Sequence, residues 1–315
     1  MMPQRKDIRS IDRRELTRKA MRAAVKTRAR AGVDQMSPVC IFDLCEKLGI
    51  TVRFTDINME GMYSGGEPPR IFVSSQRPLA RRVFTCGHEL GHHEFGHGAT
   101  VDEVNEEATA LRDENPDEFL VNSFSSFVFM PIIGLRGGFT RRGADMHTAT
   151  PAQILAVASN FGVGYATLIT HLAYGVQEIG GGRARELLRS TPKSIRRSLL
   201  GDDSSEPLVI VDVCWSGKPI DVEVGTSILL PVGSAAEGNV LRRAGSCGAG
   251  DIYEAVRAGL GRVSLALEGE HFVRVARKGD VGLARYRHME DNDVYIHRRG
   301  YADRHRRDEP LMGLG

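Results

Sequence analysis

The chain has 315 residues, of which 41% are hydrophobic and 26% are charged, and its formal net charge is +2. These proportions are ordinary for a globular protein, so they exclude a mainly disordered chain, and the length is sufficient for two or three domains. The small net charge predicts no general attraction to nucleic acid or membranes, although basic patches occur locally.

Cysteine usage and the ends of the chain bear on where the protein works. The five cysteines are odd in number and form no CxxC pair, which indicates reduced thiols in the cytosol. The N-terminal stretch MMPQRKDIRS lacks the apolar core of a signal peptide, and no apolar run approaches the roughly 18 residues of a transmembrane helix. We therefore expect a cytoplasmic protein without membrane contacts.

The first predicted elements are two helices and a strand. A basic helix is expected from Ile11 to Ala31, and its charges favour a solvated face on a packed helix over a nucleic-acid arm. Ser37-Pro38 is typical of a cap followed by proline at the first position of a second helix, which Gly49 ends. The β-rich run 50–54 then predicts a strand.

A β-hairpin is predicted next, from residues 61–66 and 70–74, with Pro68 and Pro69 at its turn. Its second strand leads directly into the following helix. Such a strand could pair with an extended peptide by strand addition, and the alternative is an ordinary strand inside a sheet.

The following helix, which Pro78 can open and Gly96 can close, carries an H-E-x-x-H pattern at His88, Glu89 and His92. Four residues turn a helix by about 400°, so both histidines share one face and can bind one Zn²⁺ at about 2.0–2.1 Å each. Glu89 stands beside the metal, where it can take a proton from a zinc-bound water and pass it to a leaving amine. The alternative is a helix with two solvated or core histidines.

A catalytic zinc usually has three protein ligands and a water, so a third ligand is expected from the acidic residues that follow. Glu118 is the preferred candidate, because Asn115-Pro116 can start a helix that Pro131 ends, with Glu118 in its first turn. Asn122 lies one turn further on the same face and could support the ligands from behind.

Other residues compete for the third position. Glu107 and Glu114 are weaker candidates on the acidic stretch. His93 is rotated by about 100° from its neighbour His92 and cannot share its face. His97 misses the longer H-E-x-x-H-x-x-G-x-x-H spacing, and a surface histidine is favoured over a capping or substrate-contact role.

Peptide hydrolysis also needs a group that stabilises the developing oxyanion. Tyr63, His93 and His97 are candidates, and the sequence does not choose among them. The expected cofactor is Zn²⁺, with Mn²⁺ as an alternative in vitro.

Two further helices are predicted around residues 150–174. Thr150-Pro151 opens the first, a turn at 161–164 follows, and Tyr165–Tyr174 forms the second. The pair resembles a helix-turn-helix, but the second helix has no Arg, Lys, Asn or Gln for base edges and phosphates. A structural pair is therefore favoured over direct DNA binding.

The remainder of the chain changes character after a predicted flexible joint at 180–182 and a basic helical stretch to Leu200 that restarts at Thr191-Pro192. Short β-rich runs are expected at 208–213, 228–232, 263–267 and 272–276, with one helix at 251–258. The glycine-rich stretch 245–250 lacks the lysine of a phosphate loop.

Together these patterns predict an α+β fold. The expected segments are a basic helix at 1–36, a metallopeptidase domain at 37–145, a helical region at 146–200, a linker at 201–207, a β-rich domain at 208–297 and a disordered basic tail at 298–315.

Five pieces of sequence carry a resemblance to a known family: ITVRF, RIFVSS, RRVFTCGHELGHHEFGH, EFLVNSFSSFVFMP and ILAVASNFGVGYATLITHL. Over residues from about 38 to 175 the chain resembles the ImmA/IrrE family of zinc metallopeptidases. The resemblance implies a zincin-like fold in which His88, His92 and Glu118 bind zinc and Glu89 is catalytic. The spacing of Glu118 and Asn122 fits the family pattern. The chain has Cys86-Gly87 where relatives usually have leucine-alanine, so small side chains are kept.

The same resemblance implies a protein substrate, a helix-turn-helix repressor of the Xre type, whose cleavage lifts repression in stress responses or mobile-element control. Some relatives carry a GAF-like sensor after the peptidase, so the region from residue 208 is a candidate sensor, although its pattern does not match that fold. Two alternatives remain: a DNA-binding regulator using residues 150–174, and a zinc-stabilised interaction or antitoxin module without turnover. The sequence does not indicate the oligomeric state.

Overall fold

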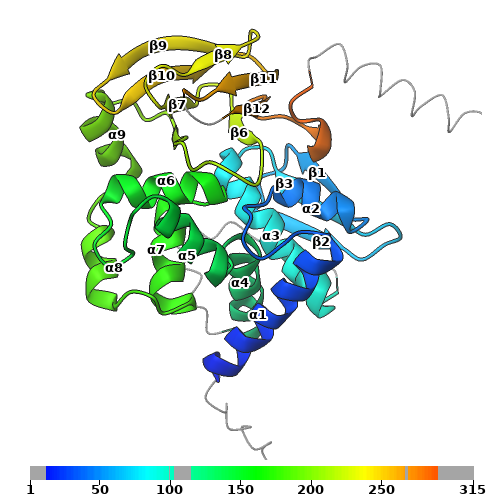
Figure 1. The fold of residues 1–315 in the computed structure, drawn as a ribbon. Helices are drawn as coiled ribbons and strands as arrows, with labels where there is room; N and C mark the ends of the chain where they lie inside the picture. The colour runs from blue at the N-terminus through cyan, green and yellow to red at the C-terminus, as the bar shows by residue number, and fades with distance from the viewer. Residues whose placement is uncertain (1–11, 99, 103–114, 267–268, 290–315) are drawn as a thin grey trace, which may run out of the picture.

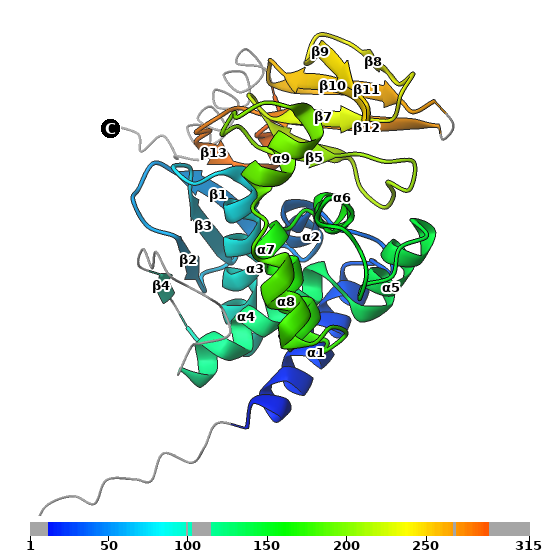
Figure 2. The same cartoon turned by 90° about the vertical axis from the view of Figure 1, so that its left-hand side faces the viewer.

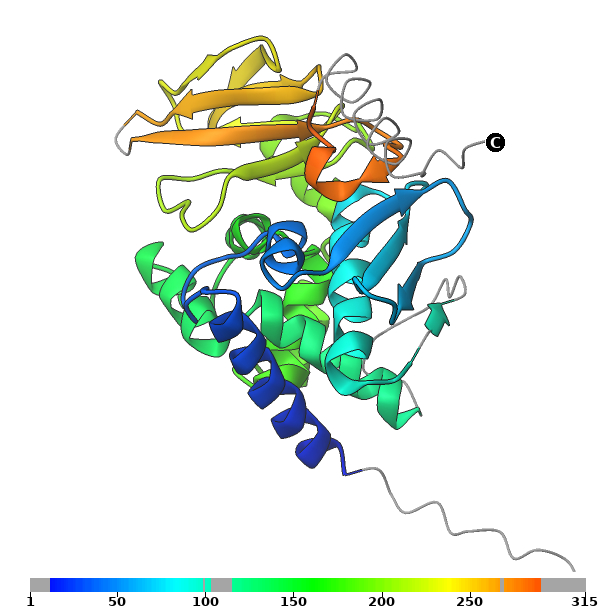
Figure 3. The ribbon, with the colours of Figure 1, turned by 90° about the vertical axis from the view of Figure 1, so that its right-hand side faces the viewer.

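The computed structural model describes residues 12–98, 100–102, 115–266 and 269–289. Within them the chain is a mixed α/β fold, in agreement with the predicted α+β class (Figure 1). The molecule has two parts in these views. The lower part consists of helices and one small sheet, and the upper part is made almost entirely of strands (Figures 1 and 3).

The lower part begins with three helices around one sheet. The helices are α1 (Arg13–Arg30), α2 (Ile41–Lys47) and α3 (Leu79–Phe95), and the strands are β1 (Thr51–Thr55), β2 (Gly61–Ser64), β3 (Arg70–Ser74) and β4 (Thr100–Asp102). The sheet has the order β13-β1-β3-β2-β4, and α3 packs along it beside β2 and β3 (Figure 2). Strand β13 (Gly282–Leu283) comes from the far end of the chain and pairs antiparallel with β1.

The predicted hairpin is confirmed, because β2 pairs antiparallel with β3. Strand β3 also pairs in parallel with β1, so both of its edges are occupied. The idea that β3 could add an extended peptide is therefore wrong, and the alternative of an ordinary sheet strand holds.

The start of α2 differs from the prediction. The helix begins at Ile41 with Cys40 at the cap position, and Ser37-Pro38 lies outside it. The physical reason is a competing turn: the Asp34 carboxylate accepts hydrogen bonds from the amides of Met36 and Ser37 and from the Ser37 hydroxyl. Ser37 is thereby committed to a turn before the helix.

Six helices with a π-helical turn complete the lower part: α4 (Pro116–Phe129), α5 (Ile132–Arg141), α6 (Pro151–Phe161), α7 (Tyr165–Thr170), the turn η1 (His171–Gly175), α8 (Gly181–Leu187) and α9 (Pro192–Leu200). The sequence did not predict α5. The joint predicted at 180–182 is wrong, because Gly180 caps α8 and the next two glycines lie inside it. A side-chain capping box at Thr150 starts α6, as its sequence predicted.

The pair formed by α6 and α7 with η1 is bent by 99°. On the second helix Leu168 and Ile169 are fully buried in the main hydrophobic core. A helix-turn-helix role for this pair stays a prediction. Among the described residues, no single helix is long and apolar enough to cross a membrane.

The upper part consists of β5 (Leu208–Ile210), β6 (Ile220–Glu223), β7 (Ser227–Leu230), β8 (Ala235–Glu237), β9 (Leu241–Cys247), β10 (Gly250–Ala255), β11 (Gly259–Ser264) and β12 (Glu270–Ala276), with a 3₁₀ turn η2 (Ala284–Tyr286) after β13. The strands form two four-stranded sheets, ordered β5-β7-β10-β9 and β6-β12-β11-β8. A second hydrophobic core, which includes Trp215, lies among them.

The helix predicted at 251–258 is wrong, because residues 251–255 belong to strand β10, which pairs antiparallel with β7 and β9. Tyr253 and Ala255 are buried and the residues between are half-buried, which is the two-residue period of a strand. The main core also continues past residue 207 into Leu208, Ile210 and Leu229, so the domain boundaries drawn from the sequence stay a prediction.

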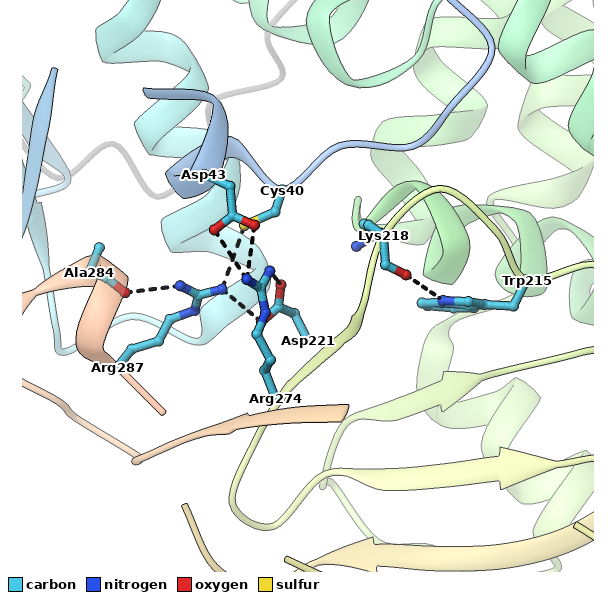
Figure 4. A network of polar contacts seen from close by, with 8 residues as sticks. All are labelled: Cys40, Asp43, Trp215, Lys218, Asp221, Arg274, Ala284 and Arg287. Atoms are coloured by element: carbon cyan, nitrogen blue, oxygen red, sulfur yellow. Dashed lines mark hydrogen bonds and ion pairs between the residues drawn. The ribbon is translucent and has the colours of Figure 1, made fainter. Parts of the chain in front are cut away.

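Charged residues also join the two parts, in an ion-pair cluster formed by Asp43, Asp221, Arg274 and Arg287 (Figure 4). Arg274 pairs with Asp221 on β6 and reaches Asp43 on α2 at 2.8 Å. Arg287, which is 1% exposed, pairs with Asp221 at 2.7 Å. The β-rich part is thus held to the helical part through side chains of α2 as well as through β13.

Candidate metal centre

Helix α3 forms with the limits that the sequence predicted. Pro78 occupies the cap position and Gly96 ends the helix in the left-handed conformation, at φ 68°. A residue without a side chain adopts that conformation without strain. The helix places His88, Glu89 and His92 in its buried second half, with the Glu89 side chain fully enclosed.

Helix α4 carries the predicted third ligand beside them. The Asn115 side chain accepts a hydrogen bond from the amide of Asp117, and Pro116 occupies the first turn, so the helix starts where the sequence predicted. Glu118 therefore lies in the first turn of α4, and Asn122 follows one turn later. The predicted end at Pro131 is confirmed as well, because Met130 caps the helix.

Two glycines let α3 and α4 approach closely. A Cβ added at Gly87 would lie 2.5 Å from the Ser125 hydroxyl oxygen, and one at Gly91 would lie 2.9 Å from the Val121 Cβ. Neither position can hold a larger residue without moving α4. The short distance between the helices brings the first turn of α4 within reach of the two histidines.

The donor cluster, formed by His88, His92 and Glu118, has the geometry of a metal site. The two histidine Nε2 atoms lie 3.0 Å apart, and Glu118 oxygens lie 3.3 Å from that of His88 and 3.7 Å from that of His92. Tetrahedral ligands at about 2.0–2.1 Å from Zn²⁺ are about 3.3–3.4 Å apart, so these separations fit the ion. Two imidazoles and one carboxylate also form a donor set found in catalytic zinc sites.

The other ring nitrogen of each histidine is held by a neighbour. The Asn122 side-chain oxygen lies 2.8 Å from His88 Nδ1, so this nitrogen carries the proton and Nε2 offers its lone pair to the donor cluster. His92 Nδ1 lies 3.1 Å from His97 Nδ1. These contacts fix the orientation of both rings.

His97 does not occupy the position that its sequence context favoured. Its side chain is only 17% exposed, and its ring packs against those of His92 and Phe95, so the interpretation as a surface histidine is wrong. It lies behind His92, outside the donor cluster. The weaker ligand candidates Glu107 and Glu114 lie outside the described residues.

Glu89 and His93 lie on another face of α3, which is turned toward strand β2. A Cβ added at Gly61 would lie 2.5 Å from a Glu89 carboxylate oxygen, so the strand backbone runs directly against this side chain. Two residues along the strand, the Tyr63 hydroxyl lies 2.9 Å from His93 Nδ1. Since His93 is one helical turn beyond Glu89, the general-base candidate and the tyrosine–histidine pair are neighbours.

Burial favours the neutral form of two further groups near the centre. It lowers the pKa of His93 below its usual value. It also raises the pKa of the Cys86 thiol, whose sulfur lies 3.9 Å from that of Cys45. All five cysteines are free in the structure, and the reduced cytosolic state expected from the sequence stays a prediction.

Sequence reasoning missed how closely neighbouring elements approach at three glycines, Gly61, Gly87 and Gly91, and noted only that Gly87 keeps a small side chain. A signal existed for two of them, because Gly87 and Gly91 are four residues apart and so lie on one helix face. Gly61 gave no such signal, because its partner Glu89 lies on a different element and is close only in the folded chain.

Comparisons with known proteins agree with the composition of the centre. Residues 45–172 match the family model described as Peptidase_M78, the IrrE N-terminal-like domain, and all members of the donor cluster lie within the match. This match confirms the resemblance to the ImmA/IrrE family.

Among solved structures, a Mycobacterium tuberculosis transcriptional regulator is similar to 52% of this chain, at 15% identity and a TM-score of 0.33. This chain covers 48% of that protein's length, and the likeness is too weak to show a shared fold. The curated proteins include no match.

Proposed function

Because this chain carries a domain of the IrrE N-terminal-like peptidase family over residues 45–172, we propose that it is a zinc-dependent endopeptidase. The observation that supports this most is the convergence of His88, His92 and Glu118, with Glu89 enclosed on the next position of the same helix. The three residues of the donor cluster would hold the ion, and Mn²⁺ is an alternative in vitro. When bound, the ion supplies a Lewis acid that polarises the scissile carbonyl and acidifies water.

The residues of the chain perform the proton transfers and the positioning. The Glu89 carboxylate takes a proton from the attacking water and delivers it to the leaving amine. Asn122 and His97 hold the rings of His88 and His92 through their Nδ1 atoms. The close strand β2 at Gly61 excludes solvent from one side of Glu89, which strengthens its interactions with charge.

The tyrosine–histidine pair is the best candidate for oxyanion stabilisation. Tyr63 and His93 are hydrogen-bonded to each other one helical turn from Glu89, so either can present a donor beside the general base. His97 is disfavoured for this role, because its Nδ1 faces the back of His92.

The proposed substrate is a protein, specifically a helix-turn-helix repressor of the Xre type, whose cleavage relieves repression. This rests on the family resemblance. Direct DNA binding through residues 150–174 is less favoured, because the second helix of that pair buries Leu168 and Ile169 in the core.

The test is to incubate the purified full chain with the helix-turn-helix repressor encoded nearest to it, in the presence of Zn²⁺, Mn²⁺ or a chelator, and to measure products by intact mass. We expect a single metal-dependent cut. Glu89→Gln should retain metal and slow the cut by about 10²–10⁴-fold or more, because the proton acceptor is lost while the ligands stay.

Glu94→Gln is the matched control, because it makes the same chemical change on the same helix at a residue paired with half-exposed Arg30. That variant should cut at the normal rate. Undiminished cleavage by Glu89→Gln would refute the mechanism. A stable, uncut complex with the repressor would instead support the interaction module without turnover.

A further inference from the structure

The N-terminus of α3 is not capped by its own neighbours. Pro78 at the cap position makes no side-chain hydrogen bond, and the first turn contains no acidic residue. The first amides of a helix need acceptors, and a negative charge there is favourable. The Leu79 amide finds its acceptor 144 residues away, in the Glu223 carboxylate of strand β6, at 3.0 Å.

The same carboxylate pairs with a fully buried cation on α3, whose charge is also favoured by Asp280. Arg82 is 0% exposed, stacks over the Phe54 ring at 4.7 Å from its centroid, and forms an ion pair with Glu223. Burial lowers the pKa of Arg82 to about 10. Glu223 therefore contacts the first turn of α3 twice, by accepting a hydrogen bond from a backbone amide and by pairing with a guanidinium.

The backbone of Glu223 is fixed by strand pairing and core packing in the β-rich part. Strand β6 pairs in parallel with β12, and Glu223 lies opposite Ala276. The two preceding inward residues, Ile220 and Val222, belong to the second core. The position of the carboxylate is therefore set by the fold of the upper part.

The close contact between α3 and α4 makes the position of α3 important for the donor cluster. At Gly87 and Gly91 the backbone of α3 lies directly against α4, where Ser125 and Val121 are the nearest side chains, so the donor cluster depends on how α3 is placed against α4. A shift of α3 along its axis would change the separations between the two histidines and Glu118 directly, because these residues lie on different helices.

We propose that Glu223 is a positioning residue of the metal centre, which fixes α3 against α4 from the β-rich part of the chain. This proposal rests on the proposed function in one respect, namely that the donor cluster binds a metal. It also means that the β-rich part is a structural component of the peptidase site.

The test compares Glu223→Gln with Asp221→Asn in the full chain. Both variants replace a carboxylate on β6 that is paired with buried arginine, but the described hydrogen bonds and ion pairs of Asp221 go to Arg274 and Arg287, which lie outside α3. We expect Glu223→Gln to weaken Zn²⁺ binding by about tenfold and to alter the visible spectrum of the Co²⁺-loaded protein, which reports ligand geometry. Asp221→Asn should change neither, at temperatures where both variants are folded.

A double variant removes the buried charge as a confounding factor. Arg82→Leu with Glu223→Leu replaces the ion pair by apolar groups, which proteins tolerate well, but leaves the Leu79 amide without its acceptor. We expect this variant to fold and still to bind Zn²⁺ more weakly than the wild type. Wild-type affinity and an unchanged Co²⁺ spectrum in this variant would overturn the proposal, as would equal effects of Glu223→Gln and Asp221→Asn.

Amide hydrogen exchange in the metal-free protein separates this proposal from the proposed function. Glu223→Gln should accelerate exchange at Leu79 and along the first turns of α3, whereas Asp221→Asn should not. If the wild type binds no metal, the proposed function fails, and the exchange data still decide whether Glu223 fixes the helix. If exchange in α3 is unchanged, the positioning role is refuted even where metal binds.

Discussion

Two largely buried groups of polar side chains differ in whether their charges are balanced by their own members. In the ion-pair cluster every carboxylate faces a guanidinium: Asp221 pairs with Arg274 and Arg287, and Asp43 pairs with Arg274 (Figure 4). In the donor cluster, two imidazole Nε2 atoms and a carboxylate converge within 4.8 Å, a set that suits a divalent cation. The first cluster is balanced by its own residues, and the second has the composition of a binding site.

This difference distinguishes charged side chains that stabilise the fold from those that form a binding site. Charges that neutralise one another across an interface hold elements together, and removing one leaves its partner buried and uncompensated. Electron-pair donors oriented toward one point by hydrogen bonds behind them, as His88 is by Asn122, instead prepare the point for a ligand. Variants in the two clusters should therefore have separable effects on stability and on metal binding.

The largest expected effect is a loss of stability when the ion-pair cluster is changed. Asp221→Asn should lower the free energy of unfolding by about 3–5 kcal/mol, because Arg287 and Arg274 would lose their buried counter-charge. Metal affinity of the folded protein should stay unchanged. Denaturant titration and zinc competition measure the two quantities, and a variant that lost metal without losing stability would contradict the distinction.

The same cluster should make stability depend on pH in acid. Burial alone would raise the pKa of Asp221, but the charges of Arg287 and Arg274 outweigh it and lower the pKa to about 2. An unfolded aspartate titrates near 3.9, so this contribution is present above about pH 4 and is lost as the pH falls toward 2. The difference in unfolding free energy between wild type and Asp221→Asn should shrink by about 2–3 kcal/mol over that interval.

A smaller loss of stability is expected when the close packing between β2 and α3 is disturbed. Gly61→Ala places a Cβ 2.5 Å from Glu89 and 2.6 Å from Thr85 Cγ2, so β2 must move away from α3 at a loss of about 1–3 kcal/mol of stability. Cleavage should fall along with stability, because Glu89 is displaced. Gly66→Ala on the same hairpin, where nothing lies within 4 Å, is the control and should behave as wild type.

The smallest expected effect lies behind the donor cluster. Asn122→Ala removes the acceptor that orients His88, and the affinity for Zn²⁺ should fall by about 10–100-fold while the fold is retained. Zinc competition with a chromophoric chelator measures the change. Unchanged affinity would mean that the ring is held by packing alone, and the hydrogen bond would then have no role in metal binding.

Much of the centre could be predicted from the sequence, because the deciding signals are local. The spacing of His88 and His92, the limits of α3 at Pro78 and Gly96, and the start of α4 at Asn115 all follow from helical periodicity and capping. Other local signals misled. Ser37-Pro38 has a cap pattern, but a side-chain turn formed by Asp34 competes for those residues.

Tertiary structure decided the rest, since strand pairing and burial depend on residues far apart in the chain. Residues 251–255 form a strand because β7 and β9 pair with them on both sides, whatever their local preference. The His97 side chain is half-buried because its ring packs against those of His92 and Phe95. The contact of Glu223 with the Leu79 amide spans 144 residues, and no periodic pattern records such a pair. The sequence alone determined which side chains could form a metal centre, and only the folded chain determined what holds them in place.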